Sequence, residues 1–196
     1  MTFDELLTEV YDITGREDLT SLSKNMIKAA TLKAHTSDFY NRDIYETGVQ
    51  FGESSLTQSF DPYNLITNFR APKYIKRVND ETDEVGKVFD VITPEEVIDS
   101  YGALKSDVYY IAGRTVEIRS AVAFSKILLG AYVLPIVREE AYSSWIAELV
   151  PYFIIFEAAS KIFKAVGQDQ EAAYLKVELA EQFDLLRTVG LTDQGY

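Results

Sequence analysis

Residues 143–167 constrain the fold of this chain more than any other stretch, because they hold its only tryptophan and its densest run of apolar side chains. The length of the run, the pair Ala158-Ala159 and the closing Gly167 predict a helix, since glycine ends helices without strain. Pro151 starts a new helix or kinks a longer one, because it has no N–H to give to an interior turn. Apolar residues surround the run almost completely, so we expect burial on most faces.

Charged residues within this run argue against a membrane span. A spanning helix needs roughly 20 apolar residues without charges, whereas Glu148, Glu157, Lys161 and Lys164 interrupt this one. We therefore interpret the run as the central helix of a soluble core. The chain opens with the acidic residues 2–5, TFDE, where a secretory leader would be basic, so no signal peptide is expected.

Composition is that of an ordinary globular protein and excludes several kinds of site. The 196 residues are 47% hydrophobic and 26% charged, which suits one domain, with or without an insert. There is no cysteine, so disulfides, thiolate metal sites and cysteine nucleophiles are excluded. The net charge of −12 argues against a broad basic face that grips nucleic acid. An acidic protein can still border DNA without holding it, or use its charge only for solubility.

Helical spacing of apolar residues marks both ends of the chain. Thr2 and Glu5 have the spacing of a capping box, in which each side chain satisfies an unpaired backbone N–H. Gly15 and Gly190 are the expected ends of the first and last helices. Besides the central helix, the predicted helices cover residues 3–13, 19–36, 139–149 and 169–189.

The middle of the chain has strand-like spacing, with aromatic and β-branched residues between turn signals. Val116 and Ile118 should share one face of a strand, because side chains alternate across a sheet. The predicted elements are a hairpin joining residues 108–111 to 114–119 through Ala112-Gly113, a second hairpin joining Val78 to residues 88–91 through an acidic loop, a short capped helix at 93–96, and a last strand at 125–134.

These patterns predict an α+β fold, a helical bundle of N- and C-terminal helices with an inserted antiparallel β-rich domain. Neither helical part can bury its apolar stripe alone, so the two should pack together. The predicted bundle comprises residues 1–43 and 136–190, and the insertion comprises residues 44–135. Residues 191–196 form a C-terminal tail that we expect to be mobile in the free protein.

Side chains with catalytic or metal-binding chemistry are few. The only histidine, His35, lies near the end of a predicted helix, where a cation suits the helix dipole, so a capping or solvated histidine is favoured over a catalytic base. One histidine without cysteine argues against zinc. Asp80, Glu81, Asp83 and Glu84 offer oxygen ligands for Ca²⁺ but lack the spacing of a calcium loop, which favours a solvated hairpin tip. We predict no metal, no cofactor and no catalytic residue.

Other catalytic signatures are also missing from the sequence. There is no Gly-rich phosphate loop and no Gly-x-Ser-x-Gly motif. The 31 acidic residues guarantee many carboxylate pairs, so any chosen pair is weak support for glycoside hydrolysis. The 13 tyrosines include Tyr109 and Tyr110 on a predicted strand, where sheet and interface contacts are the simplest interpretation. This profile is typical of a protein that works by contact rather than as an enzyme.

An ordered set of short motifs runs through both helical parts of the chain. The motifs are TGREDL at residues 14–19, FYNRD at 39–43, Trp145-Ile146-Ala147, Pro151, Ile154-Ile155, Ala158-Ala159 and Gly167. The layout resembles that of the head-to-tail adaptor proteins of short-tailed bacteriophages. The resemblance covers most of the chain, although the β-rich part matches in kind more than in sequence.

The resemblance implies a structural protein of the virion, located at the head-tail junction and made in the host cytoplasm. Such adaptors form a dodecameric ring between the portal protein and the tail tube or nozzle. Genomic DNA passes through the bore without specific binding, and no membrane is involved. We expect a monomer when free, with the portal templating the ring. Expected portal-binding residues are Val189, Leu191 and Tyr196, and expected subunit or tail contacts are Tyr45, Phe51, Tyr109 and Tyr110.

Two other functions stay open on the sequence. Some phage adaptors carry peptidoglycan hydrolase activity, for which Glu139, Glu140 or Glu148 would be the candidate acids, and a turbidity assay on cell walls separates this function from an adaptor. The chain can also be a non-phage scaffold that binds a protein partner. Ring formation on mixing with a portal protein would disfavour that scaffold.

Overall fold

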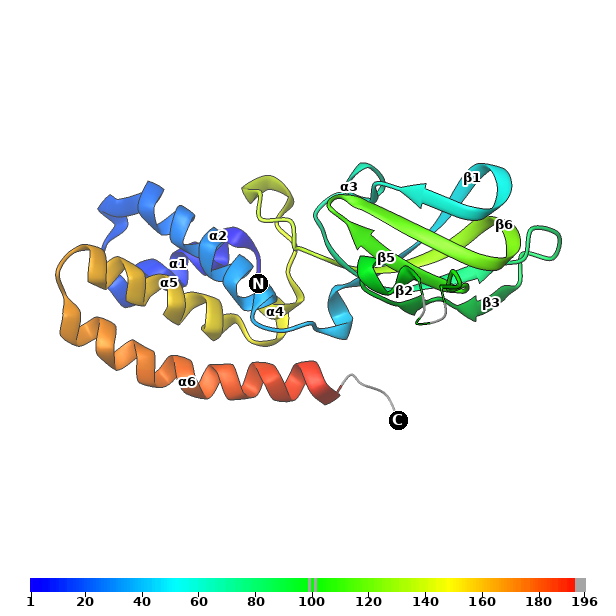
Figure 1. Cartoon of the computed structure of the whole chain (residues 1–196). Helices are drawn as coiled ribbons and strands as arrows, with labels where there is room; N and C mark the ends of the chain where they lie inside the picture. The colour runs from blue at the N-terminus through cyan, green and yellow to red at the C-terminus, as the bar shows by residue number, and fades with distance from the viewer. Residues whose placement is uncertain (99, 101, 193–196) are drawn as a thin grey trace. The chain divides into compact units, whose positions relative to one another are not determined.

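The computed structural model describes residues 1–98, 100 and 102–192. The chain divides into two compact units, each with its own apolar core (Figure 1). The helical unit comprises Met1–Asp43 and the chain from Leu134 onward, and the sheet unit comprises Ile44–Val133. Among the described residues, no helix has both the length and the apolar character needed to cross a membrane.

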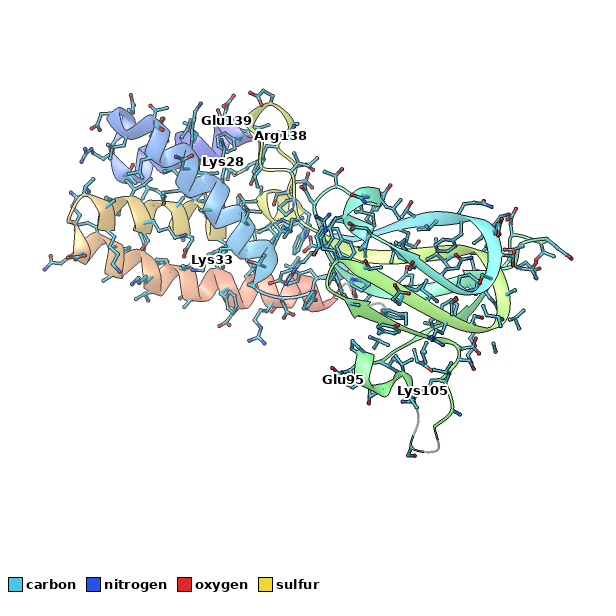
Figure 2. The ribbon with its side chains drawn as sticks, turned by 45° about the horizontal axis from the view of Figure 1, so that its top comes forward. Lys28, Lys33, Glu95, Lys105, Arg138 and Glu139 are labelled. Atoms are coloured by element: carbon cyan, nitrogen blue, oxygen red, sulfur yellow. The ribbon has the colours of Figure 1, made fainter. Side chains whose placement is uncertain are left out.

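The helical unit is built around α5. Helices α1, α2, α4 and α6 all contact it, and α2 and α6 flank it (Figures 1 and 2). Most of the apolar side chains of α5 are buried, as the sequence predicted for the central helix, although Tyr152 is 45% exposed. The helices are α1 (Phe3–Thr14), α2 (Thr20–Thr36), α4 (Trp145–Leu149), α5 (Pro151–Ala165) and α6 (Asp169–Thr192), with 3₁₀ turns at η1 (Glu17–Leu19), η2 (Asn41–Asp43) and η4 (Glu139–Ala141).

Local signals place the helix boundaries. The side chain of Thr2 accepts from the backbone N–H of Glu5, and the carboxylate of Glu5 accepts from that of Thr2, which confirms the predicted capping box. Gly15 ends α1 in the left-handed conformation, with a φ of 61°. Pro151 starts a new helix rather than kinking α4, because its missing N–H costs nothing in a first turn.

Gly190 does not end the last helix, as the sequence suggested. Helix α6 continues to Thr192, and Gly190 lies against the ring of Tyr40, where any Cβ would overlap the aromatic carbons. The glycine is therefore explained by close packing on a buried side chain, since Tyr40 is 4% exposed. The expected tail of residues 191–196 begins inside this helix, and its last four residues lie outside the described part of the chain.

The sheet unit is a six-stranded sheet in which β6 is the shared strand. Strand β1 pairs along one edge of β6, and β5 and β2 pair with successive parts of the other edge. The side chains of Phe89, Phe124 and Ile127 pack in its core. The strands are β1 (Ile44–Phe60), β2 (Phe69–Val78), β3 (Val85–Val88), β4 (Asp90–Val91), β5 (Val108–Ala112) and β6 (Thr115–Val133), with α3 (Pro62–Leu65) and the 3₁₀ turn η3 (Pro94–Val97) between them.

The predicted antiparallel sheet is wrong, because β4 and β5 run parallel. The sheet is therefore mixed, with the strands in the middle of the chain and helices at both ends. The sequence pattern favoured hairpins, which join antiparallel neighbours, whereas β4 reaches β5 through a crossover that includes η3. That crossover also holds the capping box of Thr93 and Glu96 expected at residues 93–96.

The two predicted hairpins are present, with shifted ends. Strands β5 and β6 pair from Val108 to Ala112, so the turn is Gly113-Arg114 rather than Ala112-Gly113. Strands β2 and β3 form the second hairpin. The separate last strand at residues 125–134 is wrong, because β6 is one strand of 19 residues. It remains continuous because β1 pairs with it through two register shifts that absorb the irregular middle.

Candidate functional site

The only histidine lies in the core of the helical unit. His35 is 2% exposed, so the expectation of a capping or solvated histidine is wrong. Its Nδ1 lies 2.8 Å from Oδ1 of Asp43, and its Nε2 lies 2.9 Å from Oγ of Ser144. An ionised carboxylate only accepts hydrogen bonds, so the Nδ1–H donates to Asp43. In the neutral imidazole, Nε2 then accepts from the Ser144 hydroxyl.

Trp145 completes this group, which we call the polar cluster (His35, Asp43, Ser144 and Trp145). Its Nε1–H donates to the same Oδ1 of Asp43 at 2.8 Å. The indole meets the imidazole edge-on, with ring centroids 5.7 Å apart, and meets the ring of Tyr40 edge-on at 5.3 Å. The cluster thus joins the end of α2, the segment that follows it, and the start of α4.

The hydrogen bonds from Ser144 through His35 to Asp43 follow the order of a serine hydrolase triad. The exposed fractions of these three residues are 5%, 2% and 4%. The Ser144 Oγ also accepts the backbone N–H of Ala147 at 3.3 Å, as the N-cap of α4. A substrate carbonyl has no surface at which to meet this hydroxyl. The geometry therefore supports a structural role, in which a hydrogen-bonded buried network fixes the helices relative to one another.

The three acids proposed for a hydrolase line one hollow of about 400 Å³ beside η4 and α4. Glu139 accepts from Lys24 at 2.6 Å and from Lys28 at 2.8 Å; Figure 2 labels Lys28 and Glu139 close together. The hydrogen bonds from Lys24 and then Lys28 hold the pKa of Glu139 below its ordinary value. A general acid needs a raised pKa, so Glu139 is unsuited to that role. Glu140 and Glu148 are the remaining candidates.

A buried acid on α5 binds lysines from two helices. Glu157 is 5% exposed, and its Oε1 lies 2.8 Å from Nζ of Lys33 on α2 and 3.1 Å from Nζ of Lys161 on α5 itself. Its burial is consistent with its pairing, because an unpaired buried carboxylate would be costly. In the sequence, Glu157 is visible only as a charge that interrupts an apolar run.

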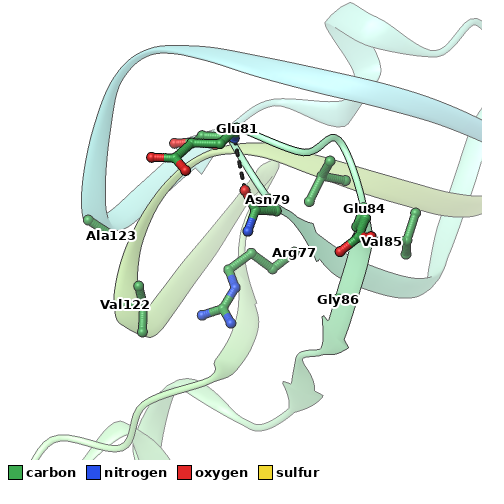
Figure 3. Close-up of a pocket in the computed structure, with 10 residues that line it drawn as sticks. Arg77, Asn79, Glu81, Glu84, Val85, Gly86, Val122 and Ala123 are labelled. Carbon is green, nitrogen blue, oxygen red and sulfur yellow. Dashed lines mark hydrogen bonds between the residues drawn. The ribbon is translucent and has the colours of Figure 1, made fainter.

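A hollow in the sheet unit lies among β2, β3 and β6, with a volume of about 490 Å³ (Figure 3). Arg77 projects into it and donates to Oγ of Ser120 at 3.3 Å. Asn79 accepts the backbone N–H of Glu81 at 2.8 Å, which shapes the rim. Glu81 and Glu84 also line the hollow, so it has no clear positive field for an anion.

The acidic loop beside this hollow uses its carboxylates to hold strands. Asp80 accepts the backbone N–H of Ser125 at 3.0 Å, and this bond holds the pKa of Asp80 below its ordinary value. Asp83 pairs with Lys126 at 2.6 Å. In the part of the chain that the structure describes, no group of three or more histidine or acidic side chains is arranged to hold a metal ion.

The four residues predicted for subunit or tail contacts differ in exposure. Tyr45 is 52% exposed on β1, so it has the surface that an interface requires. Phe51 packs edge-on against Phe124, with centroids 5.9 Å apart, and is partly buried. Tyr109 is 4% exposed in the core of the sheet unit, and Tyr110 is half-buried. Within this set, Tyr45 alone combines a large side chain with high exposure.

The three residues predicted for portal binding lie at the end of α6 or beyond it. Val189 packs at the edge of the core of the helical unit, and Leu191 belongs to the last turn of the helix. Tyr196 lies outside the described residues. The structure thus brings Val189 and Leu191 together on one helix.

No protein-family model matches the chain, and no curated protein matches its sequence.

Sequence reasoning missed Asp43 and Ser144 as members of a site. Ser144 carried a signal, because a serine directly before a helix is a favoured N-cap. Asp43 ends the FYNRD motif, and Trp145 begins the motif at residues 145–147. Two motifs that carried the adaptor resemblance therefore meet at one buried carboxylate.

Proposed function

We propose that this protein is a structural head-to-tail adaptor of a short-tailed bacteriophage, which forms a ring between the portal protein and the tail tube or nozzle. The observation that carries the proposal is the contact between two of the motifs behind the resemblance. Trp145 is bonded to Asp43, although their positions in the sequence differ by 102. A contact of this kind explains why an ordered set of short motifs would specify one helical architecture.

Most of the groups that could act in catalysis are buried or paired with lysines, which supports a role in binding other proteins. Within the described residues, the Ser-His-Asp arrangement is buried, Glu139 and Glu157 are tied to lysines, and no metal cluster is present. Large apolar side chains are nevertheless exposed, among them Tyr174 at 66% and Val177 at 65% on α6. Exposed apolar side chains that lie together are characteristic of partner surfaces.

The acidity of the chain suits a conduit for DNA. The net charge is −12, and a bore lined with negative charge repels phosphates, so DNA slides through without being held. In this proposal the free protein is a monomer, and the portal templates the ring.

The proposal is tested by electron microscopy of the full chain mixed with the purified portal protein of the same phage. We expect a ring of adaptor density added to one end of the portal. Portal particles that stay bare at saturating protein would overturn the proposal.

The C-terminal segment provides a sharper version of this test. Deleting residues 191–196 should leave the fold intact and abolish portal binding, because this segment holds Leu191 and Tyr196, two of the expected portal-binding residues. Asp12→Ala, at an exposed position of α1, is the matched control and should keep portal binding. Portal binding that survives the longer deletion would remove this role from the segment.

One observation favours a second function, peptidoglycan hydrolysis. Glu139, Glu140 and Glu148 line a single hollow, as an active site would require. A turbidity assay on purified cell walls tests it: clearing by the wild-type chain, lost in Glu140→Gln or Glu148→Gln, would establish the hydrolase, and unchanged turbidity would exclude it.

A further inference from the structure

The outer face of α6 combines exposed apolar and acidic side chains. Tyr174 is 66% exposed, Val177 is 65% exposed and Leu185 is 46% exposed. Helical spacing places Glu181 and Asp184 on the same side, opposite the stripe that faces α5. We call this surface the α6 face. No ion pair within the described residues neutralises its two acids.

The outer face of α2 carries shorter side chains than the α6 face, and it is basic. Asn25 and Ala29 are exposed, and Leu32 is half-buried between them and the end of the helix. Lys28 and Lys33 lie on the two flanks of this surface, which we call the α2 face (Figure 2). Helix α2 contains no acidic residue.

Ion pairs within the chain do not cancel the charge of the α2 face. Glu139 forms ion pairs with both Lys24 and Lys28, and Glu157 forms ion pairs with both Lys33 and Lys161. Each acid therefore neutralises one of two lysines. Helix α6 is opposite in sign, because its acidic residues outnumber its basic ones.

Within one chain, the α2 face approaches α6 at Lys33, which lines a hollow with Lys176 and Ala180 of that helix. Helix α5 contacts α2 on one side and α6 on another (Figures 1 and 2), and each outer face lies opposite the stripe that its helix turns toward α5. A basic face of small residues and an acidic face with projecting Tyr174 and Val177 are complementary in charge and in shape. Between copies, such a contact is heterologous, and it repeats from copy to copy.

We propose that the α6 face of one copy docks on the α2 face of the next copy, and that this contact is the subunit interface within the helical unit. The inference rests on the proposed ring function and specifies how neighbouring copies contact one another. In this interface Tyr174 and Val177 pack over Ala29 and Leu32, with the acids of α6 beside Lys28 and Lys33 of the neighbour.

Cysteine cross-linking tests the contact directly, because the chain has no cysteine of its own. Two full-length variants are made, Ala29→Cys and Val177→Cys, and are oxidised alone and mixed at millimolar protein concentration. We expect disulfide-linked dimers in the mixture, joining one variant to the other, and no dimer of either variant alone. Equal dimer formation in all three samples, or none in the mixture, would overturn the proposal.

A chain carrying both substitutions should form a ladder of multimers on a non-reducing gel, because each copy then offers both halves of the contact. Asp12→Cys combined with Val177→Cys is the matched control, since Asp12 is also exposed but lies on α1. We expect no ladder from the control. Melting curves equal to wild type show that the reduced variants are folded.

Charge exchange separates a specific contact from random collision. Glu181→Lys with Asp184→Lys in the Val177→Cys chain should lower the cross-linked yield about fivefold, as expected when two ion pairs become repulsive. Ser21 and Asn25 are exposed positions on α2, and adding Ser21→Glu and Asn25→Glu to the Ala29→Cys partner should restore the yield. A cross-linked yield that is unchanged by both sets of substitutions would contradict the proposed contact.

The outcomes distinguish this interface from the adaptor role. Cross-links at these positions without portal binding would keep the interface and reject the adaptor. A ring on the portal in which these positions never cross-link would keep the adaptor and reject the interface.

Discussion

The helical unit buries charged side chains, whereas every described carboxylate of the sheet unit is exposed or half-buried. Of the buried polar side chains in the described residues, all but Ser120 belong to the helical unit, and they include His35, Asp43 and Glu157. In the sheet unit, Asp80 instead ties an exposed loop to Ser125. Helices slide and rotate against one another unless a directional contact fixes them, whereas backbone pairing already fixes strand register. The difference explains why only the helical unit needs a buried polar cluster.

The largest expected effect is the loss of stability of the helical unit when Asp43 is replaced. Asp43→Ala leaves the buried N–H groups of His35 and Trp145 without their acceptor, so we expect a loss of about 3 kcal/mol in the unfolding free energy of this unit. The fluorescence of Trp145, the only tryptophan, reports this unit specifically. The exposed residue Asp12 gives the control, Asp12→Ala, with a change within about 0.5 kcal/mol. Equal stability of the two variants would contradict a stabilising role for the cluster.

Substituting one tightly packed glycine in each unit allows the packing of the two units to be compared. A Cβ at Gly190 would overlap the ring of Tyr40, and one at Gly130 would overlap the ring of Tyr74. Tyr40 is 4% exposed and has no room to move, so Gly190→Ala should destabilise the helical unit by about 1–2 kcal/mol. Tyr74 is half-buried and donates a hydrogen bond to Glu46. Because its ring is not enclosed by the core, Gly130→Ala should cost less in the sheet unit. Thermal unfolding followed by circular dichroism and tryptophan fluorescence measures both, and the reverse order would contradict the packing described.

The smallest expected effects are on the loss of stability at acidic pH. Hydrogen bonds lower the pKa of Glu139 in the helical unit and the pKa of Asp80 in the sheet unit. A lowered pKa in the folded state stabilises it above the unfolded pKa, and the stabilisation is lost as the pH falls through the folded pKa. Glu139→Gln and Asp80→Asn should each flatten the decline in stability between about pH 5 and about pH 2. Parallel curves for wild type and variants would show that these carboxylates contribute nothing.

Features that depend on neighbours in the sequence could be predicted. The capping box at Thr2 and Glu5, the new helix at Pro151 and the two hairpins all rest on residues a few positions apart. The burial of α5 followed from its composition alone, because few other segments could fill a core.

Features that depend on distant residues could not be predicted. His35 is placed by Ser144, at a sequence separation of 109, and no local pattern encodes that contact. The parallel pairing of β4 and β5 follows a crossover that carries no hairpin signal. Gly190 was taken as a helix end because the sequence does not show that Tyr40 lies against it.

The central claim is that each unit folds around its own apolar core, and the most direct test of it is to remove the sheet unit. Ile44 pairs with Tyr132, so the points where the chain leaves and re-enters the helical unit are close, and a short Gly-Ser linker can replace residues 44–133. Two separate cores predict that the joined helical segments unfold cooperatively, with a blue-shifted Trp145 emission from an indole packed against the helical core. A chain with a solvent-exposed tryptophan and no cooperative transition would contradict it.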